Sequence, residues 1–187
     1  MPEFDLDAAL VSPPVPEEYA HCIHGTWEEV DGKVNVDGWV DLSNLNLTEL
    51  PIRFGTVSRF FDCYDNQLTS LAGAPTSVGG GFSCDDNQLT SLAGAPTTVG
   101  GYFYCHHNQL TSLVGAPTTV GGDCYCYNNQ LTSLAGAPTS VGGGFSCDNN
   151  QLTSLAGAPT TVGGDFSCDE GVPGEAAYRR RIDRARI

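Results

Sequence analysis

Basic residues are almost absent from the central part of this chain. Its 187 residues include 8 Lys and Arg against 22 Asp and Glu, and none of the 8 lies between Phe60 and Tyr178. An acidic body repels phosphate groups, so we expect neither nucleic acid nor an anionic membrane to bind the repeats of the central region. Most of the basic residues are instead gathered near the C-terminus, at Arg179, Arg180, Arg181, Arg184 and Arg186.

Long apolar runs are missing as well. No run approaches the roughly 18 residues that a membrane span needs. The first residues, Met-Pro-Glu-Phe-Asp-Leu-Asp, carry neither the basic region nor the hydrophobic core of a signal peptide. We therefore expect no membrane span and no export by a standard signal. The single Met, 23 Gly and 11 Pro argue against a helical bundle and favour an all-β fold of short strands joined by turns.

What the chain does contain is a 21-residue unit, Phe-x-Cys-x-x-Asn-Gln-Leu-Thr-Ser-Leu-x-Gly-Ala-Pro-Thr-x-Val-Gly-Gly-x, repeated with little variation. Units of this length cannot each bury a hydrophobic face alone, so they stack as coils of a solenoid. The alternation around Phe82 and Cys84 predicts a strand with both side chains inward. Pro96 excludes a helix on the back of the coil, and Gly100-Gly101 is expected to form a sharp corner.

One cysteine and one asparagine recur at fixed places in the unit. Disulfide frameworks and zinc sites use paired, unevenly spaced cysteines, so a constant interval favours a buried, reduced ladder. The predicted cysteine ladder is Cys63, Cys84, Cys105, Cys126, Cys147 and Cys168. An asparagine side chain can bind backbone groups where the chain leaves the strand. The predicted asparagine ladder is Asn66, Asn87, Asn108, Asn129 and Asn150.

The coils differ from one another mainly at positions expected to point outward from the strands. The third and fourth cysteine-bearing coils carry Tyr and His there, between acidic rows, and Tyr often anchors interfaces. Cross-strand aromatic pairs also stabilise a sheet, by about 0.2–1 kcal/mol each, so a purely structural role stays open. The candidate partner-binding residues are Tyr64, Tyr102, Tyr104, His106, His107, Tyr125, Tyr127 and Asn128.

Metal binding and catalysis have weaker support in the pattern. Neighbouring strand residues point to opposite sides, so His106 and His107 are not expected to bind the same metal ion. No metal or cofactor is predicted. The acidic residues lack the Asp-x-Asp-x-Asp-Gly calcium loop. No serine has a uniquely placed His, so we expect no enzyme. A metal-binding or ice-binding solenoid is a weaker alternative, the latter from the rows Thr90, Thr111, Thr132 and Thr153.

The N-terminal part divides into an extended arm over residues 1–20 and a hairpin cap over 21–41, before the solenoid at 42–171. The arm carries Pro13-Pro14-Val15-Pro16. The two pairs Asp31-Gly32 and Asp37-Gly38 predict hairpin turns. We expect Trp27 and Trp39 to cover the first coil.

The C-terminal part, residues 172–187, is predicted to be an Arg-rich cap or tail. Residues 175–187 have the pattern of a short helix with Tyr178, Ile182 and Ala185 on one side, which would cover the last open sheet edge. The arginines could be solvated, could pair with the acidic body, or could dock on an acidic partner or a second copy.

Phe82-x-Cys84-x-x-Asn87-x-Leu89-x-x-Leu92 resembles the leucine-rich-repeat pattern L-x-L-x-x-N-x-L-x-x-L, with Phe and Cys in leucine places. Units that read NQLTSL, then GAP and VGG, are similar to the short-period repeat proteins of bacteriophages and prophages. The resemblance covers residues 39–171 and implies a right-handed solenoid with one parallel β-sheet. Gly79 stands where longer repeats carry leucine, so their convex helices are not expected.

The same resemblance implies a phage-encoded, non-enzymatic scaffold that binds another protein through its exposed strand face. The partner would belong to the host or to the virion, and the chain would act in the host cytoplasm. The alternative is a virion structural or decoration protein that docks on neighbouring subunits through its N-terminal arm and its Arg-rich C-terminus.

Overall fold

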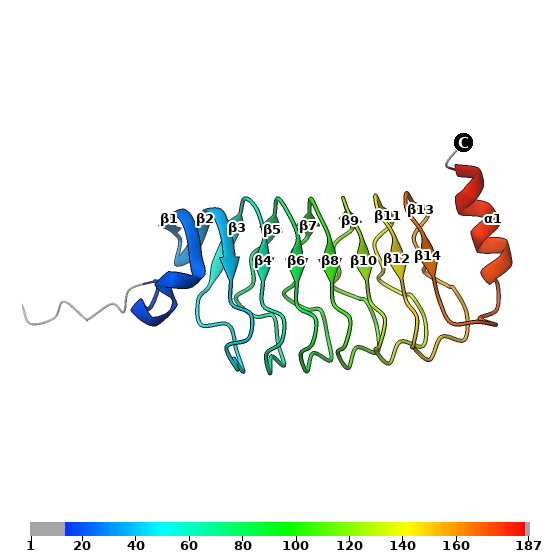
Figure 1. The fold of residues 1–187 in the computed structure, drawn as a ribbon, viewed down its shortest axis with the longest axis horizontal. Helices are drawn as coiled ribbons and strands as arrows, with labels where there is room; N and C mark the ends of the chain where they lie inside the picture. Colours follow the sequence, from blue (N-terminus) through cyan, green and yellow to red (C-terminus); the bar gives the residue numbers. More distant parts are fainter. Residues whose placement is uncertain (1–13, 186–187) are drawn as a thin grey trace, which may run out of the picture.

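The computed structural model describes residues 14–185, which form a row of stacked coils with a hairpin at one end and a helix at the other (Figure 1). Parallel pairing links each coil to the next, and the pairing register joins residues 21 positions apart, such as Phe82 with Phe103. The fold is therefore an all-β, right-handed solenoid with one sheet, as the sequence predicts. Each coil is named below by its ladder cysteine.

Two parallel strand ladders run along the solenoid. The first consists of β4 (Phe61–Asp62), β6 (Phe82–Ser83), β8 (Phe103–Tyr104), β10 (Cys124–Tyr125), β12 (Phe145–Ser146) and β14 (Phe166–Ser167). The second consists of β3 (Phe54–Val57), β5 (Ser77–Val78), β7 (Thr98–Val99), β9 (Thr119–Val120), β11 (Ser140–Val141) and β13 (Thr161–Val162). The sequence did not predict the second ladder; Pro96 excludes only a helix on the back of the coil.

The long strand β2 (Lys33–Asp41) joins the two ladders into one sheet. Its first half pairs with β3 through Val34 and Phe54, and its second half pairs with β4 through Val40 and Phe61. Each later coil repeats this path in a bent form, and from the Cys84 coil onward a Gly-Gly pair lies between its two short strands.

Glycine is needed at the Gly-Gly pairs for a reason other than the sharp corner that the sequence predicted. Neither Gly100 nor Gly101 has a positive φ. A Cβ atom at Gly100 would lie 2.1 Å from the carbonyl oxygen of Gly79 in the preceding coil. The backbone nitrogen of Gly101 donates to the oxygen of Gly80 at 2.8 Å. Glycine is required here because neighbouring coils approach too closely for any side chain.

The core fills the space that each coil encloses. Phe61, Phe82 and Phe103 stack in a row, with ring centroids 5.5 and 5.8 Å apart. Cys124 replaces a phenylalanine in this row and is buried, as expected for an apolar substitution. Two leucines and a valine of each coil complete the core, which continues without interruption from the hairpin to the C-terminal helix.

The N-terminal cap differs in detail from the prediction. A 3-10 helix, η1 (Glu17–Cys22), leads into β1 (Ile23–Val30), which pairs antiparallel with β2 through the Asp31-Gly32 turn. The second predicted turn is wrong, because Gly38 lies inside β2 opposite Gly25.

Neither tryptophan covers the first coil. Trp27 and Trp39 are 44% and 39% exposed, whereas Val15 and Cys22 are buried. Residues 14–20 thus belong to the cap rather than to an extended arm, and the rest of the predicted arm, residues 1–13, lies outside the described residues.

The C-terminal helix α1 (Glu175–Ala185) covers the last coil, as predicted. Tyr178 and Ile182 are buried, and the Tyr178 hydroxyl donates to the carbonyl oxygen of Pro159 at 2.9 Å. The coils themselves contain no helix over residues 42–171. In the part of the chain that the structure describes, no helix has the length and apolar character to cross a membrane.

Candidate functional site

The two predicted ladders lie inside the solenoid or at its wall. All eight cysteines are free and buried. The amide nitrogen of Asn108 donates to the carbonyl oxygens of Cys84, Cys105 and His106, at 3.0–3.3 Å. Its side-chain oxygen accepts from the Leu89 N–H at 2.9 Å. The other ladder asparagines repeat this arrangement between successive coils, so these residues join the coils and leave the outer face to other side chains.

Six side chains on the outside of the first ladder form one continuous layer of rings, which we call the aromatic surface. Tyr104 is stacked on Tyr102 with a centroid distance of 4.4 Å and on Tyr125 with 4.8 Å. His106 is stacked on Tyr127 at 4.3 Å. The aromatic surface comprises Tyr102, Tyr104, His106, His107, Tyr125 and Tyr127.

At one edge of this layer, Tyr102 reaches back over the preceding coil. Its ring occupies the space above Gly81, where an added Cβ would lie 2.2 Å from the ring. It stacks on Phe60 at 6.0 Å, and its hydroxyl donates to Asp62 at 3.1 Å. In the same coil as Gly81, Ser83 is buried, although it points outward from the strand. Tyr102 therefore closes over the Cys84 coil and extends the ring layer to Phe60.

At the other edge, His106 and His107 lie on the same side of the chain. Their ring centroids are 5.1 Å apart. The expectation that they point to opposite sides is wrong, because His107 is not in a strand and has a φ of 50°. Asp86 and Asn128 hold the same place in the neighbouring coils and have the same left-handed conformation, with φ of 50° and 52°. Asp and Asn adopt this conformation more readily than most residues, which was the available signal.

Each histidine has a carboxylate beside it. Nδ1 of His107 lies 3.0 Å from Oδ1 of Asp86, and Nε2 of His106 lies 3.5 Å from Oδ2 of Asp85. The amide of Asn128 donates to Nε2 of His107. Nδ1 of His106 is buried and has no hydrogen-bond partner among the described residues.

Burial dominates the electrostatics of this surface. It raises the pKa of Tyr102, Tyr104, Tyr125 and Tyr127, so these phenols stay protonated and can donate hydrogen bonds. Burial also lowers the pKa of His106, and the charge of Asp85 partly opposes that shift.

The aromatic surface has carboxylates at its borders and no cationic side chain. Asp62, Asp85 and Asp86 lie at the edges just described, and Asp123 lies beside Tyr125, whose hydroxyl donates to it at 3.4 Å. The sequence from Phe60 to Tyr178 supplies no Lys or Arg to offset these charges. The surface therefore favours a partner that is both apolar and positively charged.

The aromatic surface differs from the predicted partner-binding residues at two positions. Tyr64 is 37% exposed and makes no ring contact with the aromatic surface within residues 14–185. Phe60, which the prediction omitted, is 44% exposed and joins the layer through Tyr102. Its position, one residue before a strand and 42 residues before Tyr102, gave no local signal of this contact.

The C-terminal arginines divide into two groups. Arg179 donates to Glu175 and to the carbonyl oxygen of Phe166, and Arg181 donates to that of Pro159. Arg180 and Arg184 are exposed and border a hollow on α1. Arg186 lies outside the described residues. The first group fastens the helix to the last coil, and the second is open to solvent.

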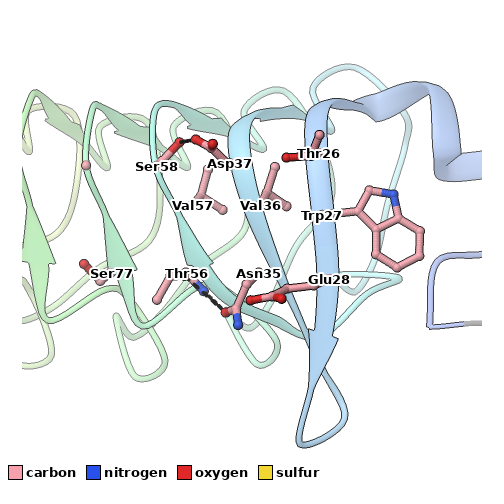
Figure 2. A pocket seen from close by; sticks show the side chains of 11 residues that line it. Thr26, Trp27, Glu28, Asn35, Val36, Asp37, Thr56, Val57, Ser58 and Ser77 are labelled. Carbon is pink, nitrogen blue, oxygen red and sulfur yellow. Dashed lines mark hydrogen bonds between the residues drawn. The ribbon is translucent and has the colours of Figure 1, made fainter.

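A separate hollow of about 530 Å³ lies where β1, β2 and β3 meet (Figure 2). Its polar groups bind one another: the Thr56 N–H donates to Asn35 at 2.9 Å, and the Ser58 hydroxyl donates to Asp37 at 2.8 Å. Asp37 is exposed, and the Trp27 indole projects beyond β1 on the side away from β2 (Figure 2). The hollow therefore does not define a particular ligand.

Comparison with protein-family models, with curated proteins and with solved structures finds no match to this chain. The residues and their geometry are thus the basis for assigning a function.

Proposed function

We propose that this chain is a non-enzymatic scaffold that binds another protein through the aromatic surface. The observation that carries the proposal is the continuous layer of four tyrosine rings, three of them stacked and the fourth tilted, with carboxylates at its border. Tyrosines are enriched at interfaces because one ring supplies a large apolar area and a hydrogen-bonding group.

Stacking prepares these rings for binding. Tyr104 is held between Tyr102 and Tyr125, with interplanar angles of 20° and 5°. A side chain already held in one orientation loses little conformational entropy when a partner covers it. The rings also stabilise the sheet, so their structural role and a binding role are compatible, and the experiment below separates them.

The partner surface that we propose has an apolar or aromatic centre and lysines or arginines at its rim. Carboxylates around the rings would attract such a rim and speed up association at low salt. Because Asp86 is exposed and Asp62 and Asp123 are partly exposed, this contribution should weaken as ionic strength rises.

The proposal that the scaffold is not an enzyme is supported by the raised pKa of the one thiol that contacts a histidine among the described residues. Cys22 contacts Nε2 of His21 at 3.5 Å, but burial raises the pKa of Cys22, whereas a catalytic cysteine needs a lowered pKa.

The resemblance of the repeats to short-period, leucine-rich-like proteins of phages supports a phage-encoded scaffold that acts in the host cytoplasm or in the virion.

Affinity capture tests the proposal with variants that the fold already accepts. Ser83 and Ser146 occupy the places of Tyr104 and Tyr125 in flanking coils, so Tyr104→Ser with Tyr125→Ser is the matched change. The immobilised protein is exposed to lysate of the phage's host, and bound proteins are identified by mass spectrometry. We expect the wild type to retain a partner with a basic surface and the double variant to lose it.

Thr90→Ala with Thr111→Ala, outside the ring layer, is the control and should retain the partner. Thermal unfolding of each variant shows whether lost capture follows from lost folding. Equal capture by the wild type and by a folded tyrosine variant would contradict the proposal.

A second candidate function is assembly into a virion through the termini. The exposed pair Arg180 and Arg184 on α1 supports it, because these two side chains are not used to hold the helix on the last coil. Mass spectrometry of purified particles would detect the chain. In that case Arg180→Ala with Arg184→Ala should reduce incorporation without changing the unfolding temperature, and normal incorporation would rule out this use of the arginines.

A further inference from the structure

The left-handed backbone at His107 creates a group of metal-ligand side chains on two neighbouring coils. Ligand atoms of Asp86, His106 and His107 all lie within 4.8 Å of one another. Asp86 belongs to the Cys84 coil and the histidines to the Cys105 coil, so stacking of the coils brings the group together. In an ordinary strand, His106 and His107 would diverge.

The distances are close to those of a tetrahedral metal site. Zinc takes bonds of about 2.0–2.2 Å to His nitrogen and carboxylate oxygen, which places neighbouring ligand atoms about 3.3 Å apart. Nδ1 of His107 and Oδ1 of Asp86 are 3.0 Å apart. The remaining separations are at most 4.8 Å, so a small movement of the side chains would bring the three ligand atoms to bonding distance of one ion. Nδ1 of His106 is buried without a hydrogen-bond partner among the described residues and is therefore free to serve as the third ligand.

Two further side chains would orient the ligands. Asp85 lies 3.5 Å from Nε2 of His106, which leaves Nδ1 of the same ring available. Asn128 binds Nε2 of His107, which leaves Nδ1 of that ring facing Asp86. The oxygen and nitrogen of an amide can exchange places by a flip, so Asn128 can accept from an Nε2–H. Metal-bound histidines commonly donate their second N–H to a carboxylate or carbonyl oxygen in this way.

We propose that Asp86, His106 and His107 bind a divalent transition-metal ion of the zinc class at the edge of the aromatic surface. Imidazole nitrogen suits zinc, nickel and copper, whereas calcium and magnesium prefer oxygen ligands alone. Three protein ligands leave a fourth position for water or for a group of another molecule. Two of the three ligands, His106 and His107, also belong to the aromatic surface, but metal binding requires only residues of this chain and can be tested without a protein partner.

Calorimetric titration of the whole protein with Zn²⁺ tests the proposal. We expect saturable binding of one ion per chain. His107→Asn and Asp86→Asn should each weaken binding by at least about tenfold. Both changes should preserve the fold, since Asn128 and Asn149 hold the same place in later coils with the same backbone conformation. His21→Gln, at a histidine far along the sequence, is the matched control and should bind as the wild type does.

Histidine side-chain NMR gives a second readout that does not depend on any variant. Zn²⁺ should shift the ring signals of His106 and His107 and leave those of His21 and His24 in place, and Mg²⁺ should shift none of them. The proposal is overturned if the wild type shows no saturable binding. It is also overturned if His107→Asn and Asp86→Asn bind Zn²⁺ as tightly as the wild type, or if only the His21 and His24 signals move.

Discussion

The hydroxyl of Tyr102 donates a hydrogen bond to Oδ1 of Asp62 at 3.1 Å, although the two residues are 40 positions apart. The phenol spans the intervening Cys84 coil and rests on Gly81. Gly81 of the Cys84 coil therefore leaves the space through which Tyr102 of the Cys105 coil reaches Asp62 of the Cys63 coil. This contact makes the outer face of three coils a single packed unit.

Gly81→Ala should displace the Tyr102 ring and break its bond to Asp62. The added Cβ would lie 2.2–2.5 Å from three ring atoms, but the ring can swing toward solvent. We expect the free energy of unfolding to fall by about 1 kcal/mol, the value of a typical hydrogen bond. Chemical denaturation measures this change.

Gly144→Ala is the matched control for Gly81→Ala, because Gly144 holds the same place in the Cys147 coil and its nearest neighbour would be at 3.2 Å. In a chain that already carries Tyr102→Gly, Gly81→Ala should lower the free energy of unfolding much less than it does in the wild type, because the ring that the added Cβ displaces is absent. Equal losses for Gly81→Ala and Gly144→Ala would show that Tyr102 does not depend on Gly81.

Asp62 should make the fold more stable in acid. Burial, opposed by the bond from Tyr102 and assisted by Asp41 and Asp85, raises the pKa of Asp62 from 3.8 to about 6. The folded state thus binds this proton more tightly than the unfolded state, so its stabilising contribution is complete below pH 4 and is lost as pH rises through 6. The shift corresponds to about 3 kcal/mol at a fully buried site, and solvent screening at this partly exposed one reduces it to about 1 kcal/mol.

Asp62→Asn removes the ionisation and keeps an oxygen for the Tyr102 hydroxyl. We expect the variant to exceed the wild type in unfolding free energy by about 1 kcal/mol at pH 8 and to match it at pH 4. Denaturation curves at both pH values measure the difference. A gain that is equal at the two pH values would exclude titration of Asp62 as its cause.

The asparagine ladder should be among the most sensitive parts of the fold. Asn108→Ala would leave the Leu89 N–H and three carbonyl oxygens without their side-chain partner. Buried groups left unpaired cost about 1–3 kcal/mol each, and relaxation and water entry reduce the sum, so we expect a loss of about 3 kcal/mol. Gln109→Ala, at the exposed neighbour, should change stability by less than about 0.5 kcal/mol. Similar effects of the two changes would contradict a ladder role for Asn108.

The eight thiols should be inert in the folded protein and reactive only after denaturation. Burial raises the pKa of Cys124 to about 12 and that of Cys168 to about 11, and it raises the pKa of Cys84, Cys105 and Cys126 as well. A thiol reagent at pH 8 needs an accessible thiolate. Counting with such a reagent should give few thiols for the native chain and eight in denaturant. Rapid reaction of several native thiols would contradict a closed core.

Much of the candidate site could be read from differences between nearly identical coils. Tyr104 and Tyr125 occupy the same place in adjacent coils, so parallel stacking alone predicts that their rings meet. The position of His107 could not be read from the alternation of strand residues, because the strand ends at Tyr104 and the backbone then turns left-handed. The Asp and Asn residues at that place in other coils were the overlooked indication.

The sequence by itself determined the all-β solenoid, its period, its inward residues and its C-terminal helix. The solenoid, its period and its inward residues follow from one coil, because each coil packs only on its neighbours and the same apolar pattern is repeated along the stack. The helix follows from the spacing of Tyr178 and Ile182 after the last coil. The tertiary structure decided which outward side chains meet. The reach of Tyr102 to Asp62, and the approach of His107 to Asp86, depend on backbone direction and on the space left by residues of other coils, which an apolar pattern does not encode.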